Sequence, residues 1–352
     1  MYTHDDNAIL RAAADQTFTI EQDAFGSWLA ERNEACTPPV QPTRVGVGQS
    51  NLTFEVADSA GRRWVLRRPP LGRLLASAHD VAREARILTA LAPTDVPVPR
   101  IIDVRHDDDA ALVLMEHVDG IVLDRTSNAD LLTTEQRHSA GISLARTLTR
   151  VHAVDLAATG LIDLASHKPY APRQVKRWTA QWQTSKTREF PLVEQLADRL
   201  LASAPAQTEL TLVHGDYNLR NVITSPESGE VAAVLDWELC TLGEPLADLG
   251  CLLTYWPAPG EPTIGDLGMS TLPGFPSRDE LIDEYLGITG RDRRALSYWH
   301  ALGLWKLAVI AEGVLRRTID DPRNRAAAGT PTAEVVNGLV ELADEIAGAA
   351  GY

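Results

Sequence analysis

The pattern of apolar and polar positions changes along the chain, from short runs bounded by turn residues to long runs with helical spacing. In the first third, short runs bounded by Gly, Pro and Asp predict a strand, tight turn and strand over 45–56, and further strands over 64–67, 101–104 and 111–116. Helical spacing predicts one main helix among them, over 77–91. This part is therefore expected to form a small antiparallel sheet with one main helix.

Two helices in this N-terminal part carry further signals. The first is predicted over 19–31, where Thr19 and Gln22 fit a capping box at its start. In the helix predicted over 77–91, Glu84 falls on the same face as the apolar residues. A carboxylate on such a face is costly unless it is paired. We therefore expect a cation within reach of Glu84.

From position 123 onward the pattern is mainly helical. Helices are predicted over 134–152, 174–185, 191–202, 278–288, 294–319 and 333–346, and short apolar strands over 210–213 and 231–235. Ser277 and Glu280 mark one helix start. These patterns predict an α+β fold with an N-terminal lobe over 1–115, a hinge over 116–120 and a helical C-terminal lobe over 121–352.

Composition and charge exclude several classes of protein. Of 352 residues, 44% are hydrophobic and 23% are charged, as in ordinary globular enzymes. The net charge of -15 and the lack of a Lys/Arg run disfavour nucleic acid as a partner. No apolar stretch is long enough to span a bilayer, and the acidic start does not resemble a signal peptide. Three scattered cysteines favour a reducing compartment, so we expect a cytoplasmic protein without a membrane or nucleic-acid partner.

The strongest chemical signal is an apolar strand followed by a tight polar turn. This segment is Leu212-Val213-His214-Gly215-Asp216-Tyr217-Asn218-Leu219-Arg220-Asn221. A second apolar strand ends in Leu235-Asp236-Trp237-Glu238. Phosphoryl transfer needs a carboxylate to orient the attacking hydroxyl and accept its proton, and oxygen ligands for Mg²⁺. Asp216 suits the first role, and Asn221 and Asp236 suit the second.

This combination resembles the aminoglycoside phosphotransferase family and its choline-kinase-like relatives, which are distant cousins of protein kinases. The resemblance extends from about Val45 to Arg317. It implies a protein-kinase-like two-lobed fold and transfer of phosphate from ATP or GTP, with Mg²⁺, to a small-molecule hydroxyl. The likeness is greatest to the phosphotransferase domains that accompany acyl-CoA dehydrogenases. That likeness rests on Gly48 to Thr53, Val65 to Pro70, Ala78 to Asp80, Arg83-Glu84 and Leu235 to Glu238.

The resemblance assigns nucleotide contacts in the N-terminal part. The turn over 45–51 would cover the phosphates, with Ser50 and Asn51 as polar contacts, although alone it would be an ordinary hairpin turn. Arg67 stands where kinases carry a phosphate-binding Lys, and an Arg can also contact phosphates. Glu84 is its natural partner. A surface strand Arg and a solvated helix edge are the alternatives for these two residues.

The segment around Glu116 resembles a kinase hinge. There the backbone of Glu116 and Val118 would meet the adenine edge of the nucleotide. A plain strand between domains is the alternative. Because a hinge is needed wherever two lobes meet, the segment is assigned to nucleotide binding. The neighbouring His117 is expected to be structural.

Several residues near the catalytic motif are candidates for support or for acceptor contacts. His214 matches a loop histidine whose role in the family is mainly structural. Asp248 resembles the acidic residue that braces this loop, although a helix N-cap is also open to it. Trp237 and Glu238 follow the metal carboxylate directly and are candidates to face the acceptor.

Three functions remain open. The leading one is a small-molecule kinase, for which the acyl-CoA-associated branch implies a hydroxyacyl-CoA acceptor. The second is aminoglycoside phosphorylation. The third is a pseudokinase-like binding module, supported only by Arg67 in place of Lys. A CoA acceptor would need a basic patch, and the candidates, with a solvated helix face as the alternative, are Lys168, Arg173, Lys176 and Arg177.

Overall fold

The computed structural model describes residues 10–12, 18–45, 51–69, 80–107, 110–321 and 329–352. The chain divides into two compact units. The first comprises Met1–Asp119 and Asp236–Glu238, and the second comprises Gly120–Leu235 and Leu239–Tyr352. The first boundary lies inside the segment predicted as a hinge. The short segment 236–238 differs from the prediction, since it groups with the first unit rather than with the C-terminal lobe.

The first unit is built on a five-stranded antiparallel sheet with the order β3-β4-β5-β7-β6. Its strands are β3 (Val40–Val45), β4 (Leu52–Asp58), β5 (Arg63–Arg68), β6 (Ile101–Asp107) and β7 (Ala110–Glu116). Its helices are α1 (Gln22–Glu31) and α2 (Val81–Leu91), and β1 (Leu10–Ala12) pairs with β2 (Phe18–Ile20). The predicted small antiparallel sheet with one main helix and an N-terminal helix is confirmed.

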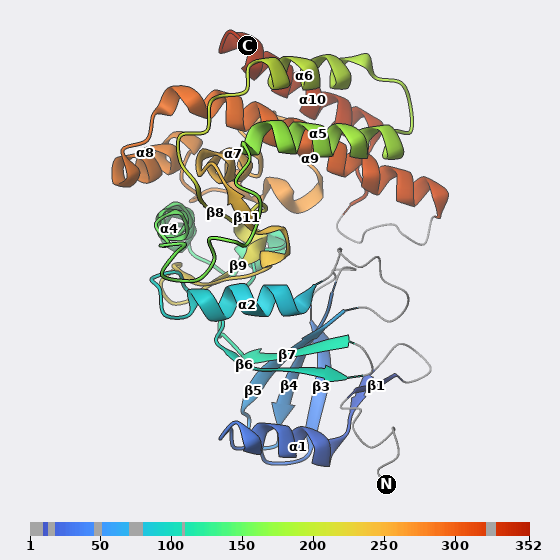
Figure 1. The fold of residues 1–352 in the computed structure, drawn as a ribbon, viewed down its shortest axis with the longest axis vertical. Coiled ribbons are helices and arrows are strands. Elements are labelled where there is room, and N and C mark those ends of the chain that lie inside the picture. Colours follow the sequence, from blue (N-terminus) through green and yellow to red (C-terminus); the bar gives the residue numbers. More distant parts are fainter. Residues whose placement is uncertain (1–9, 13–17, 46–50, 70–79, 108–109, 322–328) are drawn as a thin grey trace. The chain divides into compact units, whose positions relative to one another are not determined.

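The two helices cover opposite faces of this sheet (Figure 1). Along β5, Trp64 and Leu66 join the core under α1, while Val65 packs with the cluster under α2. This division follows from the period of two in a strand, where successive side chains point to opposite faces. The same alternation leaves Arg67 on the α2 face of β5.

The start of α1 differs from the sequence prediction. Thr19 lies in β2, and the N-cap of α1 is Glu21, without a side-chain capping bond. Gln22 instead bonds the strand β3: its Nε2 donates to the Val40 carbonyl at 2.8 Å, and its Oε1 accepts from the Val40 N–H at 2.7 Å. The capping box over Thr19 and Gln22 was therefore wrong, because the Gln22 amide satisfies a strand edge rather than the helix end.

The second unit is mainly helical. Its longer helices are α4 (Thr134–His152), α5 (Tyr170–Ser185), α6 (Pro191–Ala202), α7 (Leu246–Thr254), α8 (Arg278–Thr289), α9 (Leu296–Asp320) and α10 (Ala333–Ala349). The remaining turns of this unit are α3 (Thr126–Ala129), η1 (Leu219–Asn221), η3 (Gly265–Thr271) and η4 (Arg293–Ala295). The turn η2 (Trp237–Leu239) begins in the segment 236–238 of the first unit. The capping box predicted at Ser277 and Glu280 is confirmed at the start of α8.

Helix α9 is buried over most of its length and packs against α5, α6, α7 and α10 (Figure 1). Its crossing with α7 is close because small residues face each other there. A Cβ on Gly250 would come within 2.5 Å of the Trp299 backbone, and one on Gly303 within 2.6 Å of the Thr254 hydroxyl. The two glycines let α7 and α9 approach closely. In the described part of the chain, no helix is long and apolar enough to cross a membrane.

Two short antiparallel pairs of strands in the second unit hold the predicted catalytic segments. Strand β8 (Thr211–Val213) pairs with β11 (Thr241–Gly243), and β9 (Val222–Thr224) pairs with β10 (Val231–Val234). The segment 214–221 therefore connects β8 to β9, and Asp236 follows β10. A polar loop with both ends fixed in paired strands is a suitable base for positioned side chains.

Candidate active site

Asp216 occupies the middle of the loop between β8 and β9. Its Oδ2 accepts a hydrogen bond from Asn221 Nδ2 at 3.0 Å, and its Oδ1 accepts one from the Tyr255 hydroxyl at 3.0 Å. Burial raises the pKa of Tyr255 well above its ordinary value, so this phenol stays protonated and remains a donor. Each carboxylate oxygen has two acceptor positions, so both oxygens can still accept a further proton or hydrogen bond.

The backbone of the loop is held by Asp248 on α7. Its two carboxylate oxygens accept from the N–H groups of His214 at 2.6 Å and Gly215 at 2.8 Å. Gly215 has φ +87°, and a Cβ there would lie 2.7 Å from the Leu239 carbonyl oxygen, so only glycine fits. The helix N-cap is Pro245, not Asp248, which is the alternative the sequence left open. Asp248 thus contacts the loop directly.

His214 contributes to the same arrangement. Its Nε2 bonds the Leu235 carbonyl at 2.8 Å, and its Nδ1 accepts from the Asp216 N–H at 3.3 Å. The imidazole is fully buried. It therefore links the loop to the end of β10, and its position suits support rather than contact with an acceptor.

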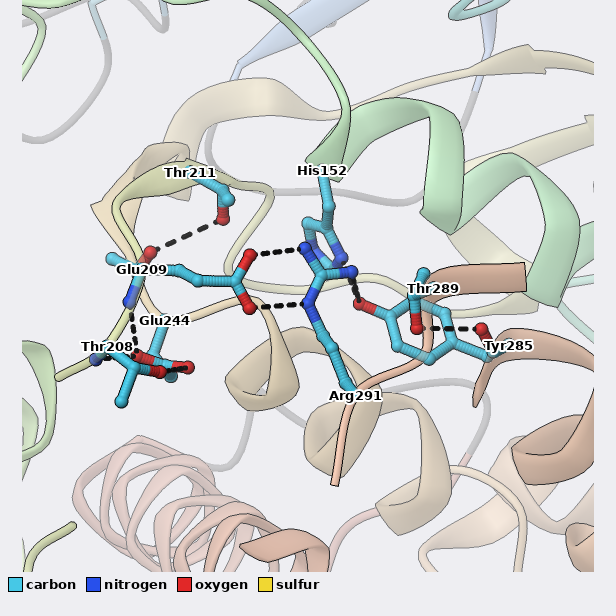
Figure 2. A network of polar contacts seen from close by, with 9 residues as sticks. His152, Thr208, Glu209, Thr211, Glu244, Tyr285, Thr289 and Arg291 are labelled. Carbon is cyan, nitrogen blue, oxygen red and sulfur yellow. Dashed lines mark hydrogen bonds and ion pairs between the residues drawn. The ribbon is translucent and has the colours of Figure 1, made fainter. Parts of the chain in front are cut away.

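A chain of polar contacts joins His152, Tyr285, Arg291 and Glu209 (Figure 2), and His152 connects this chain to Asp248. His152 bonds Asp248 through Nε2 at 3.3 Å and the Tyr285 hydroxyl through Nδ1 at 2.6 Å. Arg291 donates to the same hydroxyl at 3.0 Å and forms two bonds to Glu209 at 2.8 and 2.7 Å. Arg is only a donor, so the Tyr285 hydroxyl must donate to Nδ1, and His152 carries its proton on Nε2. Burial lowers the pKa of His152, which keeps the ring neutral.

Asn221 and Asp236 are the predicted metal ligands, and the structure shows which atoms they offer. Asn221 Nδ2 donates to both the carbonyl and the carboxylate of Asp216, so Asn221 Oδ1 is the atom left for a cation. The Leu235 N–H donates to the Asn221 carbonyl at 2.8 Å, immediately before Asp236. Asp236 has a left-handed backbone with φ 62°, uncommon for a residue other than glycine. These oxygens are of the type Mg²⁺ prefers.

In the first unit, Arg67 lies between two carboxylates. Its Nε is 3.0 Å from Glu84 Oε2, and one terminal nitrogen donates to Asp236 Oδ1 at 2.9 Å. Burial alone would lower the pKa of Arg67, but the charges of Glu84 and Asp236 outweigh it and raise the pKa. For Glu84, burial dominates and raises the pKa, with Arg67 opposing it. The Trp237 N–H also bonds Glu84, and Arg83 donates to the Glu238 carbonyl, which is why 236–238 groups with this unit.

The predicted hinge contacts are only partly available. The Glu116 N–H donates to the Arg100 carbonyl at 3.0 Å, so this N–H is not open to an adenine edge. In the described residues, Val118 makes no backbone hydrogen bond, which leaves both of its polar groups open. His117 lies 3.0 Å from Glu55, as expected for a structural residue.

The remaining nucleotide and acceptor candidates have varied surroundings. Ser50 lies outside the described residues. Asn51 is buried, and its Oδ1 has no partner among the described residues. The Trp237 side chain is fully buried, which argues against a direct contact with an acceptor. Glu238 is half-buried.

Sequence reasoning missed two residues beside Asp216. Tyr255, directly after α7, bonds the Asp216 carboxylate, and Lys306 on α9 donates to the Gly215 carbonyl at 2.7 Å. No sequence pattern marks Tyr255. Lys306 did carry a signal, because it interrupts an apolar helix, and a charge on an apolar helix face is costly without a partner whether it is a carboxylate or an ammonium.

The fold and the loop define the class of this protein. A five-stranded antiparallel sheet with its helix α2, followed by a helical unit that carries His-Gly-Asp and a downstream Asn, is the protein-kinase-like fold, as the sequence predicted. The sequence signature of the phosphotransferase enzyme family matches residues 42–281. The chain therefore belongs to the phosphotransferase enzyme family.

Individual relatives agree with this family. The mouse protein "Acyl-CoA dehydrogenase family member 10" is 35% identical over 348 residues, which cover 96% of this chain and 32% of the relative. The rat "Acyl-CoA dehydrogenase family member 11" is 35% identical over 286 residues, 78% of this chain and 36% of the relative. The chain thus spans about a third of the length of these curated relatives. The likeness to phosphotransferase domains associated with acyl-CoA dehydrogenases is confirmed.

Two solved structures show the same fold. A crystal structure from Ralstonia eutropha, provisionally assigned as an aminoglycoside phosphotransferase, matches with a TM-score of 0.75 and 29% identity, covering 94% of this chain and 98% of that chain. The GDP complex of aminoglycoside 2′-phosphotransferase-IIIa matches with a TM-score of 0.59 and 14% identity, covering 94% and 99%. At 14% identity the second match supports the fold alone.

Proposed function

We propose that the chain transfers the γ-phosphate of ATP, or of GTP, to a hydroxyl of a small molecule. The observation that carries this proposal is the setting of Asp216. Neutral donors on Asn221 and Tyr255 hold its two oxygens, and Asp248 holds the backbone before it. Among the described residues, no cation pairs with this carboxylate. It is therefore oriented but not neutralised, as a proton acceptor for a hydroxyl must be.

In the proposed reaction, the acceptor oxygen attacks the γ-phosphorus while its proton passes to Asp216. The bond between the γ-phosphorus and the oxygen that bridges it to the β-phosphorus breaks, and ADP leaves with that bonding pair. The products are ADP and a phosphate monoester. Asn221 and Tyr255 keep the Asp216 carboxylate in one orientation, so binding the acceptor in the right place supplies much of the rate enhancement.

Asn221 and Asp236 are the proposed ligands of Mg²⁺. Their support is the Oδ1 of Asn221 that remains after Nδ2 is used, and the Asp236 carboxylate, whose side chain is 37% exposed. Water and phosphate oxygens would complete the octahedral shell that this cation requires. When bound, Mg²⁺ neutralises charge on the phosphate oxygens.

For the nucleotide, Arg67 is the proposed phosphate contact. Its support is the placement by Glu84, which fixes a guanidinium that is 16% exposed. Ser50 and Asn51 are proposed as further phosphate contacts. The Glu116 carbonyl and the Val118 backbone are proposed for the adenine edge; in support, Val118 forms no backbone hydrogen bond among the described residues.

The proposed acceptor is a hydroxylated acyl compound, such as a hydroxyacyl-CoA. The relatives named after acyl-CoA dehydrogenases support this choice. A second support is the basic patch predicted from the sequence, formed by Lys168, Arg173, Lys176 and Arg177. Among the described residues none of these four forms an ion pair with a carboxylate, although Arg173 donates to the carbonyls of Lys168 and Leu242.

Aminoglycoside phosphorylation is the alternative acceptor chemistry, favoured by the net charge of -15, which suits a polycation. The binding-module alternative is weaker. A pure binder has no need for Asp216, Asn221 and Asp236 together.

The test is an ADP-release assay with hydroxyacyl-CoAs, aminoglycosides and amino alcohols in parallel. We expect Asp216→Asn to lose phosphoryl transfer by about 10²–10⁴-fold while it still binds nucleotide, because the amide cannot take a proton. Asp163→Asn, an exposed carboxylate in the same unit, is the matched control and should behave as the wild type. Turnover by Asp216→Asn close to that of the wild type would refute the assignment.

A further inference from the structure

The polar groups around Arg67 form a small cluster inside the first unit. Arg67 lies on β5, Glu84 on α2 and Asp236 in the segment 236–238 that groups with this unit. Glu84 is buried, whereas the Arg67 side chain is 16% exposed and the Asp236 side chain is 37% exposed. The guanidinium therefore lies between a buried carboxylate and a carboxylate that solvent can reach.

Arg67 contacts the two carboxylates through different nitrogens. Its Nε lies 3.0 Å from Glu84 Oε2, and its Nη2 donates to Asp236 Oδ1 at 2.9 Å. A guanidinium has five N–H donors in a planar fork, whereas a lysine ammonium is a single point of charge. The ion pair at Nε can therefore persist while the terminal nitrogens exchange one acceptor for another.

The two ends of the cluster differ in how readily they release the guanidinium. Glu84 is buried, and it also accepts a hydrogen bond from the Trp237 N–H. A buried carboxylate that loses its cation is left with an uncompensated charge, which is strongly destabilising. Asp236 is more than a third exposed, so water can take the place of Arg67 there at little cost. Release of Arg67 from Asp236 is thus much easier than release from Glu84.

Arg67 and a divalent cation compete for Asp236. The Oδ1 to which Nη2 donates is one of the two oxygens that Asp236 offers to a cation. Two positive charges a few ångström apart repel each other, and they do so more strongly in a partly buried site than in bulk water. Nucleotide phosphates relieve this competition, because their oxygens accept from an arginine fork as a carboxylate does.

We propose that Arg67 covers Asp236 in the nucleotide-free protein and moves its terminal nitrogen to the phosphates when a nucleotide binds, so that a divalent cation binds Asp236 only together with the nucleotide. This inference rests on the proposed function, which makes Asp236 a metal ligand and Arg67 a phosphate contact, and it makes the first role depend on the second. The simpler role for Arg67 is a permanent brace, which keeps its contact with Asp236 whether or not a nucleotide is bound.

The first experiment compares the wild type with Asp236→Asn. Mn²⁺ takes the same oxygen ligands as Mg²⁺, and the paramagnetic resonance signal of free Mn²⁺ measures how much is bound. Without nucleotide, we expect the two proteins to bind Mn²⁺ equally, because Asp236 is covered. With saturating ADP, Asp236→Asn should bind Mn²⁺ about tenfold or more weakly than the wild type. ADP complexes Mn²⁺ in solution to the same extent in both samples, so this difference comes from the protein.

Two results of this experiment would overturn the proposal, and they differ in what they mean for the proposed function. Without nucleotide, tighter Mn²⁺ binding by the wild type than by Asp236→Asn would show that Asp236 binds a cation while Arg67 is present. The metal assignment would then stand and only the covering would be wrong. With ADP, equal binding by the two proteins would show that Asp236 is not a metal ligand, and the metal assignment would be wrong as well.

Variants at Arg67 then test the covering directly. Without nucleotide, Arg67→Met should bind Mn²⁺ about tenfold or more tightly than the wild type, because Asp236 is uncovered. Since this change leaves a buried carboxylate unpaired, the double variant Arg67→Met with Glu84→Leu, which removes both charges of the buried pair, is measured beside it and should also bind Mn²⁺ more tightly.

Arg294→Met is the matched control. It likewise frees a carboxylate from its arginine, since Arg294 pairs with Asp292 at 3.1 Å on the surface, where the Arg294 side chain is 92% exposed. An exposed carboxylate alone does not make a metal site, so this variant should bind Mn²⁺ like the wild type. If the folded Arg67 variants bound Mn²⁺ no more tightly than Arg294→Met, Arg67 would be a brace and the proposal would fail.

Discussion

Replacing Tyr285 by Phe removes one hydroxyl from the middle of the polar chain in Figure 2 and leaves the packing of the ring in place. The Tyr285 ring is fully buried, and its hydroxyl serves Arg291 and His152 at the same time. Arg291 keeps its two bonds to Glu209 in the variant. His152 Nδ1, by contrast, becomes a buried acceptor without a donor, since the side chain of His152 is 0% exposed.

A buried polar atom left without its partner costs about 1–3 kcal/mol of the free energy of unfolding. For a unit of this size, each kcal/mol lowers the melting temperature by about 2–4 °C. For a cost of about 2 kcal/mol, we therefore expect the melting temperature of Tyr285→Phe to lie about 4–8 °C below that of the wild type. Activity should also fall, because the His152 ring would lose the bond at Nδ1 that helps to orient it, while its Nε2 bonds Asp248, which positions the N–H groups before Asp216.

The assay is thermal unfolding followed by circular dichroism, with steady-state kinetics on the same preparations. Thr289→Val is the matched control, because Thr289 also donates a hydroxyl on α8, to the Tyr285 carbonyl at 2.9 Å. That carbonyl lies in a helix, so the control should cost less than about 1 kcal/mol. If Tyr285→Phe were as stable and as active as Thr289→Val, the chain from Arg291 to Asp248 would not support the loop.

Three further predictions concern the nucleotide site and pH. Asp236→Ala should weaken Mg²⁺-dependent ATP binding more than Asn221→Ala does, because an anionic ligand stabilises a bound dication more than a neutral amide does. Calorimetry with Mg-ATP measures both losses, and the reverse order would contradict the metal assignment. Glu84→Ala should raise the KM for ATP, because Arg67 would be misplaced. The effect on KM of changing Arg67 and Glu84 together should be smaller than the sum of the two single effects, in free-energy terms, whereas additive effects would show that the pair is not coupled. Burial lowers the pKa of His300 to about 3, so the folded protein keeps this ring neutral while the unfolded chain takes up a proton below about pH 6.5. The free energy of unfolding therefore decreases as pH falls from about 6.5 towards 3. Replacing His300 by Leu should reduce the slope of this free energy against pH by up to about 1.4 kcal/mol per pH unit. Urea titrations at pH 4, 5 and 6 would detect the change.

Much of the fold could be predicted from local patterns. Helices α4 and α6 have the predicted bounds, because a long amphipathic period and clear end signals such as Pro191 leave little choice. Helix α7 was missed, since nearly all of it is buried and it has no polar face to give a helical period. The start of α1 was wrong because the partner of Gln22 is a strand that follows it in sequence.

Part of the candidate site could likewise be predicted from local sequence, and part could not. The spacing from Asp216 to Asn221 lies within one loop, and Asp236 follows directly on a strand, so neighbouring residues were enough to select them as candidates. A buried carboxylate on a helix face was also enough to predict a cation near Glu84, since the cost of an unpaired charge does not depend on the details of the fold.

The sequence by itself therefore determined the family, the main helices and strands, and the residues of the proposed phosphoryl transfer, because these depend on short-range spacing and residue type. Only the tertiary structure decided which distant side chains meet the loop. Tyr255, Lys306 and the chain from Arg291 through His152 to Asp248 come from α7, α8, α9 and α4 or the segments beside them. Their contacts depend on how those helices pack, notably on the close crossing of α7 and α9 at two glycines. Packing of this kind is set by the summed shapes of many side chains, which no single segment of sequence contains.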